Sequence, residues 1–178
     1  MKEVNRNMNL FERWIEKKYL GIKNNLALYD QLSGTYNYNW LNLIAREKYR
    51  NRKVYITVID LNNFKEINDS IGHIAANGVL LMIGEKLLGL TGVDKSVEVA
   101  RFGGDEFTIF SETDISNYIK DDTLISYGSH CKKADESLDS AINIADKKMY
   151  KYKAKAKKEG LSPKLVVKNT KKELKKNK

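Results

Sequence analysis

The chain has 178 residues, a hydrophobic content of 42% and a formal net charge of +9 at pH 7. This length and composition fit one globular domain with a sizeable core. No apolar run approaches the roughly 20 residues that a membrane span needs, and the N-terminus lacks the apolar core of a signal peptide. The single cysteine, Cys131, excludes an internal disulfide. We therefore expect a protein of the reducing cytoplasm, with Cys131 in its core.

The two ends of the chain differ from its middle. Residues 10–29 place apolar side chains at helical spacing around Gly21, so residues 1–26 are expected to form a helical segment that packs on the core or on a partner chain. We expect no sensor domain within this segment. Residues 161–178 form a Lys-rich tail that we expect to be flexible and solvated. Nucleic-acid binding through this tail, which would be strongly salt-dependent, is the less favoured interpretation.

Between these ends, residues 27–160 alternate strand and helix signals. The β-branched and aromatic run from Val54 to Ile59 predicts a strand that stops at Asp60. The order of the signals predicts an α+β fold of the ferredoxin-like palm type, in which helices cover an antiparallel sheet. The expected elements are a polar turn over 30–39, a helix over 40–50, the strand over 54–59, one long helix over 64–88, a strand over 97–100, a hairpin strand over 108–110, a short helix over 115–120, a strand over 123–130 and a helix over 137–158.

The stretch from Arg101 to Phe107, Arg-Phe-Gly-Gly-Asp-Glu-Phe, is a hairpin signal. Two glycines followed by two acids and a strand indicate a tight turn that carries carboxylates at its tip. If this hairpin neighbours the first strand, Asp60, Asp105 and Glu106 converge at one edge of the sheet. Three carboxylates in one place repel one another unless a cation lies between them. The sequence therefore predicts a Mg²⁺ site of the kind that handles phosphates.

The same heptapeptide is the signature of the GGDEF family of cyclic-dinucleotide synthases, and further segments of the chain resemble that family in order. The resemblance covers roughly residues 27–158. It implies a palm fold, a nucleotidyltransferase activity and a divalent metal cofactor. The other segments that carry it are Asp30–Asn37, Asp60–Asp69, Gly72-His73 and Ala145–Lys153.

One spacing separates this chain from ordinary GGDEF domains. The stretch between Phe107 and Ala145 is shorter than in those domains, which carry a full helix there. A trimmed, stand-alone palm resembles the minimal CRISPR polymerases, relatives of the CRISPR polymerase that makes cyclic oligonucleotides. That resemblance implies a setting in bacterial antiviral defence.

The family resemblance also implies roles for individual residues in phosphoryl transfer. Two Mg²⁺ or Mn²⁺ ions would be held in each active site, and lysines and the amides at a helix start would hold the triphosphate. An acidic turn without metal and solvated surface lysines are the structural alternatives. The residues expected to be catalytic are Asp60, Lys65, Asp105 and Glu106, and those expected to bind metal are Asp60, Leu61 through its carbonyl, Asp105 and Glu106. Those expected to contact the nucleotide are Asn63, Phe64, Lys65, Asn68, Asn77, Gly103, Gly104, Lys153 and Lys157.

Three positions depart from the family's pattern. Asn62 stands where the family usually has Asp, a change that would weaken one metal if the position is a ligand. The residues Asp94–Val97 replace the Arg-x-x-Asp product-inhibition site of many diguanylate cyclases, so inhibition by that route is not expected. Asn77 stands where the family has an Asp that accepts hydrogen bonds from guanine. Asparagine offers one acceptor and one donor, which suits adenine, so ATP is favoured over GTP unless Asn77 merely weakens guanine binding.

We therefore expect a cyclase that joins two nucleoside triphosphates into a cyclic dinucleotide, with cyclic di-AMP as the first choice, and releases pyrophosphate. Because each protomer would hold one nucleotide, two facing sites and a homodimer are expected, and a separate effector would read the product. The alternatives are a diguanylate cyclase that makes cyclic di-GMP from GTP, an enzyme with a longer oligoadenylate product, and an inactive domain that only binds a nucleotide or a protein.

Overall fold

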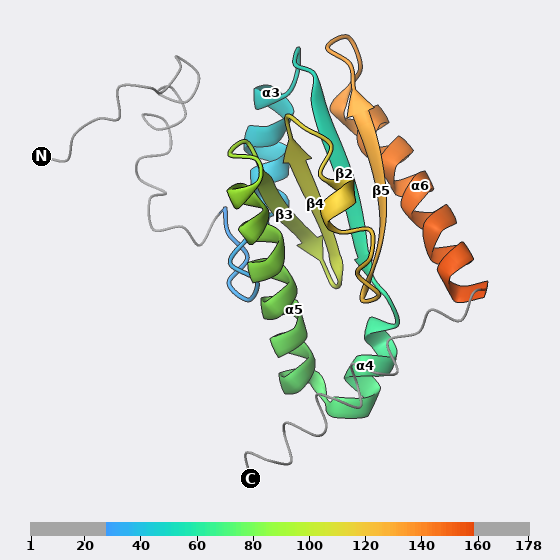
Figure 1. The fold of residues 1–178 in the computed structure, drawn as a ribbon. Helices are drawn as coiled ribbons and strands as arrows, with labels where there is room; N and C mark the ends of the chain where they lie inside the picture. Colours follow the sequence, from blue (N-terminus) through green and yellow to red (C-terminus); the bar gives the residue numbers. More distant parts are fainter. Residues whose placement is uncertain (1–27, 159–178) are drawn as a thin grey trace, which may run out of the picture.

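The computed structural model describes residues 28–158, so the expected N-terminal helical segment and the Lys-rich tail lie outside the described residues. Within that range, strands and helices alternate as drawn in Figure 1. The strands are β1 (Tyr36–Asn37), β2 (Val54–Leu61), β3 (Glu98–Gly103), β4 (Glu106–Ser111) and β5 (Ile125–Lys132). The helices are α2 (Tyr38–Trp40), α3 (Arg46–Lys48), α4 (Phe64–Ile71), α5 (His73–Leu88) and α6 (Leu138–Lys158), with a π-helical turn η2 (Leu41–Ala45) and 3₁₀ turns η3 (Gly89–Gly92) and η4 (Ser116–Tyr118).

The described strands form one five-stranded sheet in the order β1-β3-β4-β2-β5. Neighbouring strands are antiparallel except for the short edge strand β1, which runs parallel to β3. The expected α+β palm fold is confirmed, but the sheet is mixed and not purely antiparallel. The sequence predicts only a polar turn before the first helix, because two residues are too few to show a strand period. Tyr36 and Asn37 nevertheless pair with Ala100 and Arg101.

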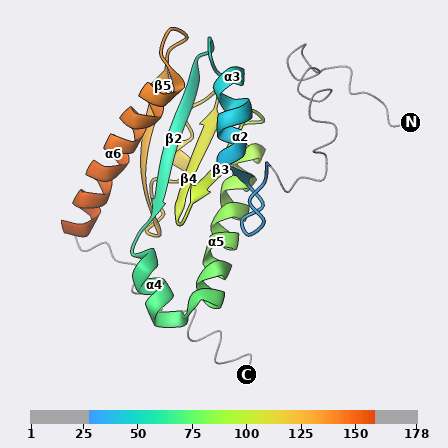
Figure 2. The same cartoon turned by 180° about the vertical axis from the view of Figure 1, so that it is seen from behind.

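Alternation along β2 divides the core between the two faces of the sheet. Ile59 and Leu61 belong to a cluster with α5, whereas Ile56 and Val58 belong to a cluster with α6 and the helical stretch from α2 to α3. Figures 1 and 2 show these helices on opposite faces of the sheet. Asp60 continues the period of Ile56 and Val58, so its side chain leaves the sheet on the face that α6 covers.

The long helix predicted over 64–88 is two helices, and this part of the prediction was wrong. Gly72 interrupts it with φ of 80°, a conformation that favours glycine, and so separates α4 from α5. The apolar spacing continues through the break because both helices pack on the same core cluster. The predicted helix over 40–50 spans α2, η2 and α3, with a π-helical middle.

The connection between β4 and β5 is short and contains the 3₁₀ turn η4. Ile115, Ile119 and Leu124 from this connection lie in the core cluster with α5, so aliphatic side chains fill the space there. The trimmed character predicted for this half of the fold fits the structure. Cys131, expected in the core, is only half-buried on β5.

By length and composition alone, the helical stretch His73–Gly92 is apolar enough to cross a membrane, and 39% of its most apolar window is buried. Core helices of globular proteins pass the same test. Val79, Leu80 and Ile83 pack in the core cluster under the sheet, so α5 serves as a core helix in this fold. The expected cytoplasmic location and the division of the chain at residues 26 and 160 stay predictions.

Candidate functional site

The end of β2 and the β3–β4 hairpin bring the predicted acids together at one edge of the sheet, here called the acid edge. Asp60 is the cross-strand partner of Glu106, so the two side chains leave the same face with Cβ atoms roughly 5 Å apart. The Leu61 amide donates a hydrogen bond of 3.2 Å to the Asp105 carbonyl, which holds the hairpin tip beside the end of β2. Like charges directly opposite each other destabilise a sheet, so this edge is unfavourable on electrostatic grounds alone.

Two glycines and one arginine shape the hairpin tip. Gly103 and Gly104 have φ of 143° and 53°, values that L side chains rarely adopt. The Arg101 guanidinium donates to the Gly104 carbonyl at 3.1 and 2.5 Å and to Asp30 Oδ1 at 2.9 Å. The tip is thereby tied to the turn that precedes β1, and this tie fixes the position of Asp105.

Burial and mutual repulsion raise the pKa of both hairpin acids. Burial raises the pKa of Asp105, and the neighbouring Asp60 raises it further. Burial likewise raises the pKa of Glu106, with added repulsion from Asp60, Asp105 and Asp146. The Lys153 ammonium, from α6, pairs with Asp60 Oδ1. One ammonium among four carboxylates leaves the acid edge with an excess of negative charge.

The acid edge fits a hard divalent cation in its chemistry. Asp60, Asp105 and Glu106 supply carboxylate oxygens and Leu61 supplies a carbonyl, the ligand type that Mg²⁺ prefers. Within residues 28–158, however, no three acid, imidazole or thiol groups surround one common point, and Lys153 takes the position of a cation beside Asp60. A divalent ion would neutralise the repulsion that raises the two pKa values. The number of ions stays a prediction.

Asn62, which departs from the family's Asp, ties β2 to the start of β5. Its buried side chain donates from Nδ2 to the Thr123 carbonyl at 3.1 Å and accepts at Oδ1 from the Ser126 hydroxyl at 2.6 Å. The backbone N–H of Asn62 donates to the Leu124 carbonyl at 2.7 Å. The side-chain bonds engage both ends of the Asn62 amide and explain its burial beside β5.

The residues expected to hold the triphosphate lie around the start of α4 and the end of α6. Asn63 precedes α4 in the left-handed conformation, with φ of 56°, and Phe64 packs against the core cluster. Lys65 and Lys157 are exposed. Lys157 lies about one helical turn beyond Lys153 on α6. Of the expected lysines, the structure therefore places Lys153 directly on an acid.

The residues expected to contact the base lie on either side of the break at Gly72. Asn68 Oδ1 accepts a hydrogen bond of 3.1 Å from His73 Nδ1 in the tautomer that carries the ring proton on Nδ1. Asn77 is exposed on the first half of α5. Asn68 is half-buried and Asn77 is exposed, and both are close in sequence to the junction between α4 and α5.

The list of expected site residues omits two contributors that the structure places at the acid edge. Asp146 is close enough to Glu106 to raise its pKa, and it precedes Lys153 on α6 by two helical turns. Arg101 positions the hairpin tip with its partner Asp30, at 2.9 Å. Asp146, Arg101 and Asp30 all lie inside the segments that resemble the family. Their place in those motifs was the available signal, together with the helical spacing of Asp146 and Lys153.

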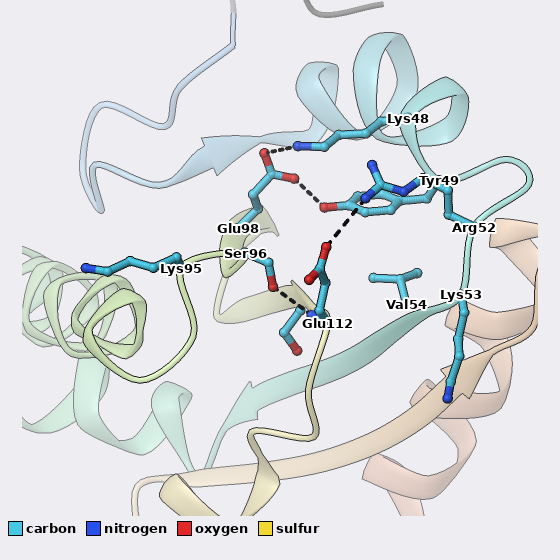
Figure 3. A pocket seen from close by; sticks show the side chains of 10 residues that line it. Lys48, Tyr49, Arg52, Lys53, Val54, Lys95, Ser96, Glu98 and Glu112 are labelled. Carbon is cyan, nitrogen blue, oxygen red and sulfur yellow. Dashed lines mark hydrogen bonds and ion pairs between the residues drawn. The ribbon is translucent and has the colours of Figure 1, made fainter. Parts of the chain in front are cut away.

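A cavity formed by described residues lies far from the acids. It measures about 290 Å³ and occupies the opposite end of the sheet, where Glu98 accepts hydrogen bonds from Lys48 at 2.7 Å and Tyr49 at 2.5 Å (Figure 3). A cavity of about 210 Å³ adjoins Asn62 and Tyr152. Cavity size therefore does not identify the site. The larger cavity is lined by Lys48, Tyr49, Arg52, Lys53, Val54, Lys95, Ser96, Glu98, Ser111 and Glu112.

The site combines acids on a Gly-Gly hairpin of a palm-like sheet with a lysine on helix α6. This combination defines a class of domain, and comparison with known proteins identifies that class. The family model described as "Diguanylate cyclase, GGDEF domain" matches residues 27–121, more than half of the chain. The chain belongs to the GGDEF domain family.

Curated relatives carry this domain within much longer proteins. The chain is 34% identical over 91 residues to diguanylate cyclase DgcP of Escherichia coli, a match that covers 51% of this chain and 24% of DgcP. It is 30% identical over 94 residues to diguanylate cyclase DgcS of Shewanella oneidensis, covering 50% of this chain and 31% of DgcS. It is 32% identical over 92 residues to cyclic di-GMP phosphodiesterase NbdA of Pseudomonas aeruginosa, of which it covers 12%. The chain thus spans less than a third of each of these relatives.

Solved structures show the same fold. A microbial GGDEF domain studied for its interaction with cyclic di-GMP superposes with a TM-score of 0.64 at 25% identity, covering 75% of this chain and 94% of that domain. Diguanylate cyclase SiaD of Pseudomonas aeruginosa, solved in complex with its activator SiaC, superposes with a TM-score of 0.65 at 19% identity. That match covers 82% of this chain and 65% of SiaD.

Proposed function

We propose that this chain is a metal-dependent nucleotidyl cyclase that joins two nucleoside triphosphates into a cyclic dinucleotide. The observation that carries the proposal is the meeting of Asp60, Asp105 and Glu106 at one sheet edge, with Lys153 against Asp60. An edge with this excess of negative charge favours cations and the phosphates that cations bind. The relatives named diguanylate cyclases support the same class of reaction.

The acids would hold the cofactor. Two divalent ions would stabilise charge on the phosphoryl oxygens, and Asp60, Asp105, Glu106 and the Leu61 carbonyl would hold them. Arg101 keeps the hairpin tip in place through its hydrogen bonds to Gly104, so the tip does not have to order when substrate arrives.

The basic residues would hold the substrate. Lys153 would exchange its ion pair with Asp60 for one with the triphosphate once cations occupy the acid edge. Asn63 and Phe64 would present backbone amides at the start of α4, and Lys65 and Lys157 would add positive charge.

Cyclisation requires two such sites. The ribose hydroxyl of each nucleotide attacks the α-phosphate of the other, so two phosphodiester bonds form and two pyrophosphates leave. Because one site holds one nucleotide, we propose a homodimer in which the sites face each other. A separate effector would read the product, and the trimmed β4–β5 connection supports a relation to the minimal CRISPR polymerases and their defence setting.

The identity of the nucleotide base is the more specific part of the proposal. Asn77 is exposed on α5, beside the α4–α5 junction, and its amide offers one donor and one acceptor to adenine. We therefore propose ATP as the substrate and cyclic di-AMP as the product. GTP and cyclic di-GMP form the second candidate, favoured by the names of the relatives.

Product analysis tests the reaction. Purified protein is incubated with Mg²⁺ or Mn²⁺ and each nucleoside triphosphate, singly and in pairs, and the products are identified by mass spectrometry. Cyclic di-AMP from ATP alone supports the whole proposal, and cyclic di-GMP retains the cyclase but not the base assignment. If pyrophosphate is released from no pair while nucleotide still binds, the protein is a binding domain.

Substitution at Asn77 tests the base assignment separately. Asn77→Asp restores an acceptor-only side chain and should shift the ratio of ATP to GTP turnover toward GTP by about tenfold, the scale of one mismatched hydrogen-bond partner. Asn77→Gln keeps the donor and acceptor and serves as the matched control. An unchanged ratio in Asn77→Asp would show that this residue does not read the base.

A further inference from the structure

His73 lies between the two asparagines that are expected to contact the base. It is the first residue of α5, so Asn77 follows it by about one helical turn. Across the break at Gly72, Nδ1 of His73 lies 3.1 Å from Oδ1 of Asn68, in the second half of α4. His73 therefore contacts one of the two expected base-contacting residues and is a helical neighbour of the other.

Backbone hydrogen bonds fix the geometry of this junction. Gly72 turns the chain with φ of 80°. Its N–H donates to the Asn68 carbonyl at 2.8 Å, and its carbonyl accepts from the Ala76 N–H at 3.0 Å. The backbone thus holds the Cα atoms of Asn68 and His73 in place on the two sides of the break. The contact between their side chains forms between two fixed points.

This contact determines how the Asn68 amide is turned. A side-chain amide carries an acceptor on one branch and two N–H donors on the other. With a proton on Nδ1, His73 is a donor and holds the Oδ1 branch of Asn68 toward itself. Among residues 28–158, no group forms a hydrogen bond with Nδ2 of Asn68. The branch that remains for a ligand is therefore the donor.

A donor at this position discriminates between the two purines. Adenine offers acceptors at its ring nitrogens, whereas guanine also carries N–H donors at N1 and N2. An amide donor that faces a guanine N–H leaves both groups unpaired, and such a mismatch lowers affinity by about tenfold. The orientation of the Asn68 amide therefore favours adenine, the base that the amide of Asn77 also suits.

We propose that His73 is a positioning residue that favours adenine over guanine by holding the Asn68 amide with its donor toward the base. This inference rests on the proposed function, because it takes Asn68 to be a contact of the nucleotide base. It adds a residue that determines specificity through the orientation of a neighbouring amide and not through its own contact with the base.

Substitutions at position 73 change the partner of Asn68 in a directed way. Asparagine places an amide near the position of Nδ1 and so retains a donor, whereas aspartate places an acceptor-only carboxylate there. In His73→Asp, the Asn68 amide should turn over, so that Oδ1 faces the base and guanine is favoured. An acid in the first turn of a helix is favourable, so α5 should stay folded in this variant.

Binding of non-hydrolysable ATP and GTP analogues to the full chain with Mg²⁺ measures the preference without turnover. Calorimetric titration gives the ratio of the two Kd values. His73→Asp should shift this ratio toward the GTP analogue by about tenfold, and His73→Asn should stay within about twofold of the parent. Ile74→Asp is the matched control for the added charge, because Ile74 is the next residue and is 92% exposed. Its ratio should equal that of the parent.

A double-mutant cycle tests the route through Asn68. In an Asn68→Ala background, His73→Asp should change the ratio by less than about twofold, because the amide that it turns is absent. A full shift in that background would mean that residue 73 contacts the base directly or acts through Asn77. Either result would overturn the inference.

The remaining outcomes separate this inference from the proposed function. If the analogues bind but His73→Asp leaves their ratio unchanged, His73 only joins α4 to α5, and the inference falls while the proposed cyclase stands. Equal shifts of the ratio in His73→Asp and Ile74→Asp would assign the effect to charge alone and would also overturn it. A parent protein that binds neither analogue would refute the proposed function, and this inference with it.

Discussion

The carboxylates at the two ends of the sheet differ in how fully neighbouring groups compensate their charge. At the end that holds the larger cavity, Lys48 neutralises Glu98 at 2.7 Å and the Tyr49 hydroxyl donates a hydrogen bond to it (Figure 3). Asp94 accepts four hydrogen bonds from Ser96 and Thr113. At the acid edge, acids from β2 and from the hairpin face one another with a single ammonium among them. The first end is saturated with partners, and the second is not.

This difference distinguishes charged groups that stabilise the fold from charged groups that can bind a ligand. Compensated carboxylates stabilise the fold and have little left to offer a ligand. Carboxylates that repel one another cost folding free energy, and such a cost is typical of sites that bind cations or substrate. The acid edge is therefore the better candidate site even though the opposite end has the larger cavity.

The largest expected effect comes from removing an acid at the acid edge. Asp105→Ala should lower cyclic-dinucleotide synthesis by about a hundredfold or more, the usual scale for one group that stabilises transition-state charge. Its melting temperature should stay level or rise, because the side chain is lost from a repulsive cluster. Turnover is measured by pyrophosphate release and stability by thermal unfolding.

Glu112→Ala at the opposite end is the control for this variant. Glu112 is exposed and its contact with Arg52 is long, at 3.5 Å, so activity should be unchanged. Near-normal turnover in Asp105→Ala, or equal losses in the two variants, would remove the distinction between the two ends.

A stability effect of intermediate size is expected at Lys132, which is fully buried at the saturated end. Its ammonium donates to the carbonyls of Arg50, Arg52 and Lys133 at 3.2, 3.1 and 2.9 Å. Lys132→Met keeps the volume but leaves carbonyls unsatisfied, and we expect a loss of about 3 kcal/mol in the free energy of unfolding. Denaturant unfolding measures it, and Lys133→Met at an exposed position should cost much less.

The pH dependence of stability should have opposite sign at the two ends. Hydrogen bonds from Ser96 and Thr113 hold the pKa of Asp94 well below its ordinary value. Asp94 therefore stabilises the fold above about pH 4, its unfolded value, and this contribution is lost as the pH falls toward the folded pKa. Burial and Asp60 raise the pKa of Asp105, so the native state binds its proton at higher pH than the unfolded chain does. The destabilisation from Asp105 is then largest near neutral pH and shrinks as the pH falls toward 4.

Asn substitutions at the two positions measure these two pH dependences of stability. At pH 7, Asp94→Asn should lower the free energy of unfolding by about 1 kcal/mol through weakened hydrogen bonds, and Asp105→Asn should raise it by a smaller amount. The difference for Asp105→Asn should narrow as the pH falls toward about 4, and the difference for Asp94→Asn should narrow only below about pH 4. Thermal melts from about pH 2 to pH 8 measure both, and slopes of the same sign in the two variants would contradict the electrostatic contrast.

The features that sequence could predict are those with a strong local signal. The β-branched run before Asp60 and the Gly-Gly turn before Asp105 identify two strands and their acidic ends. Their pairing places the acids at one edge, as the structure has it. The ion pair of Lys153 with Asp60 could only be anticipated through the family resemblance, because it joins residues far apart in the chain.

Other features depend on tertiary contacts that leave no local pattern. Strand β1 is too short to show alternation, and the break at Gly72 lies inside a continuous apolar period. The burial of Lys132 is set by three carbonyls from the turn before β2 and from its own neighbour. A lysine beside another lysine normally indicates an exposed position, so the burial of Lys132 could not be predicted before the fold was known.

The smallest expected effect lies in the middle of the sheet, between the two ends. Thr108 is fully buried on β4, and within the described residues its hydroxyl has no hydrogen-bond partner. Thr57, on the neighbouring strand β2, is equally buried but bonds to the Ser129 hydroxyl at 3.2 Å. Valine has the same shape as threonine without the polar group. Thr108→Val should therefore stabilise the fold by up to about 1 kcal/mol, or roughly 2–4 °C in melting temperature, whereas Thr57→Val should destabilise it by a similar amount. Matched thermal melts compare the pair, and a loss of stability in both variants would mean that the Thr108 hydroxyl has a partner, such as a buried water.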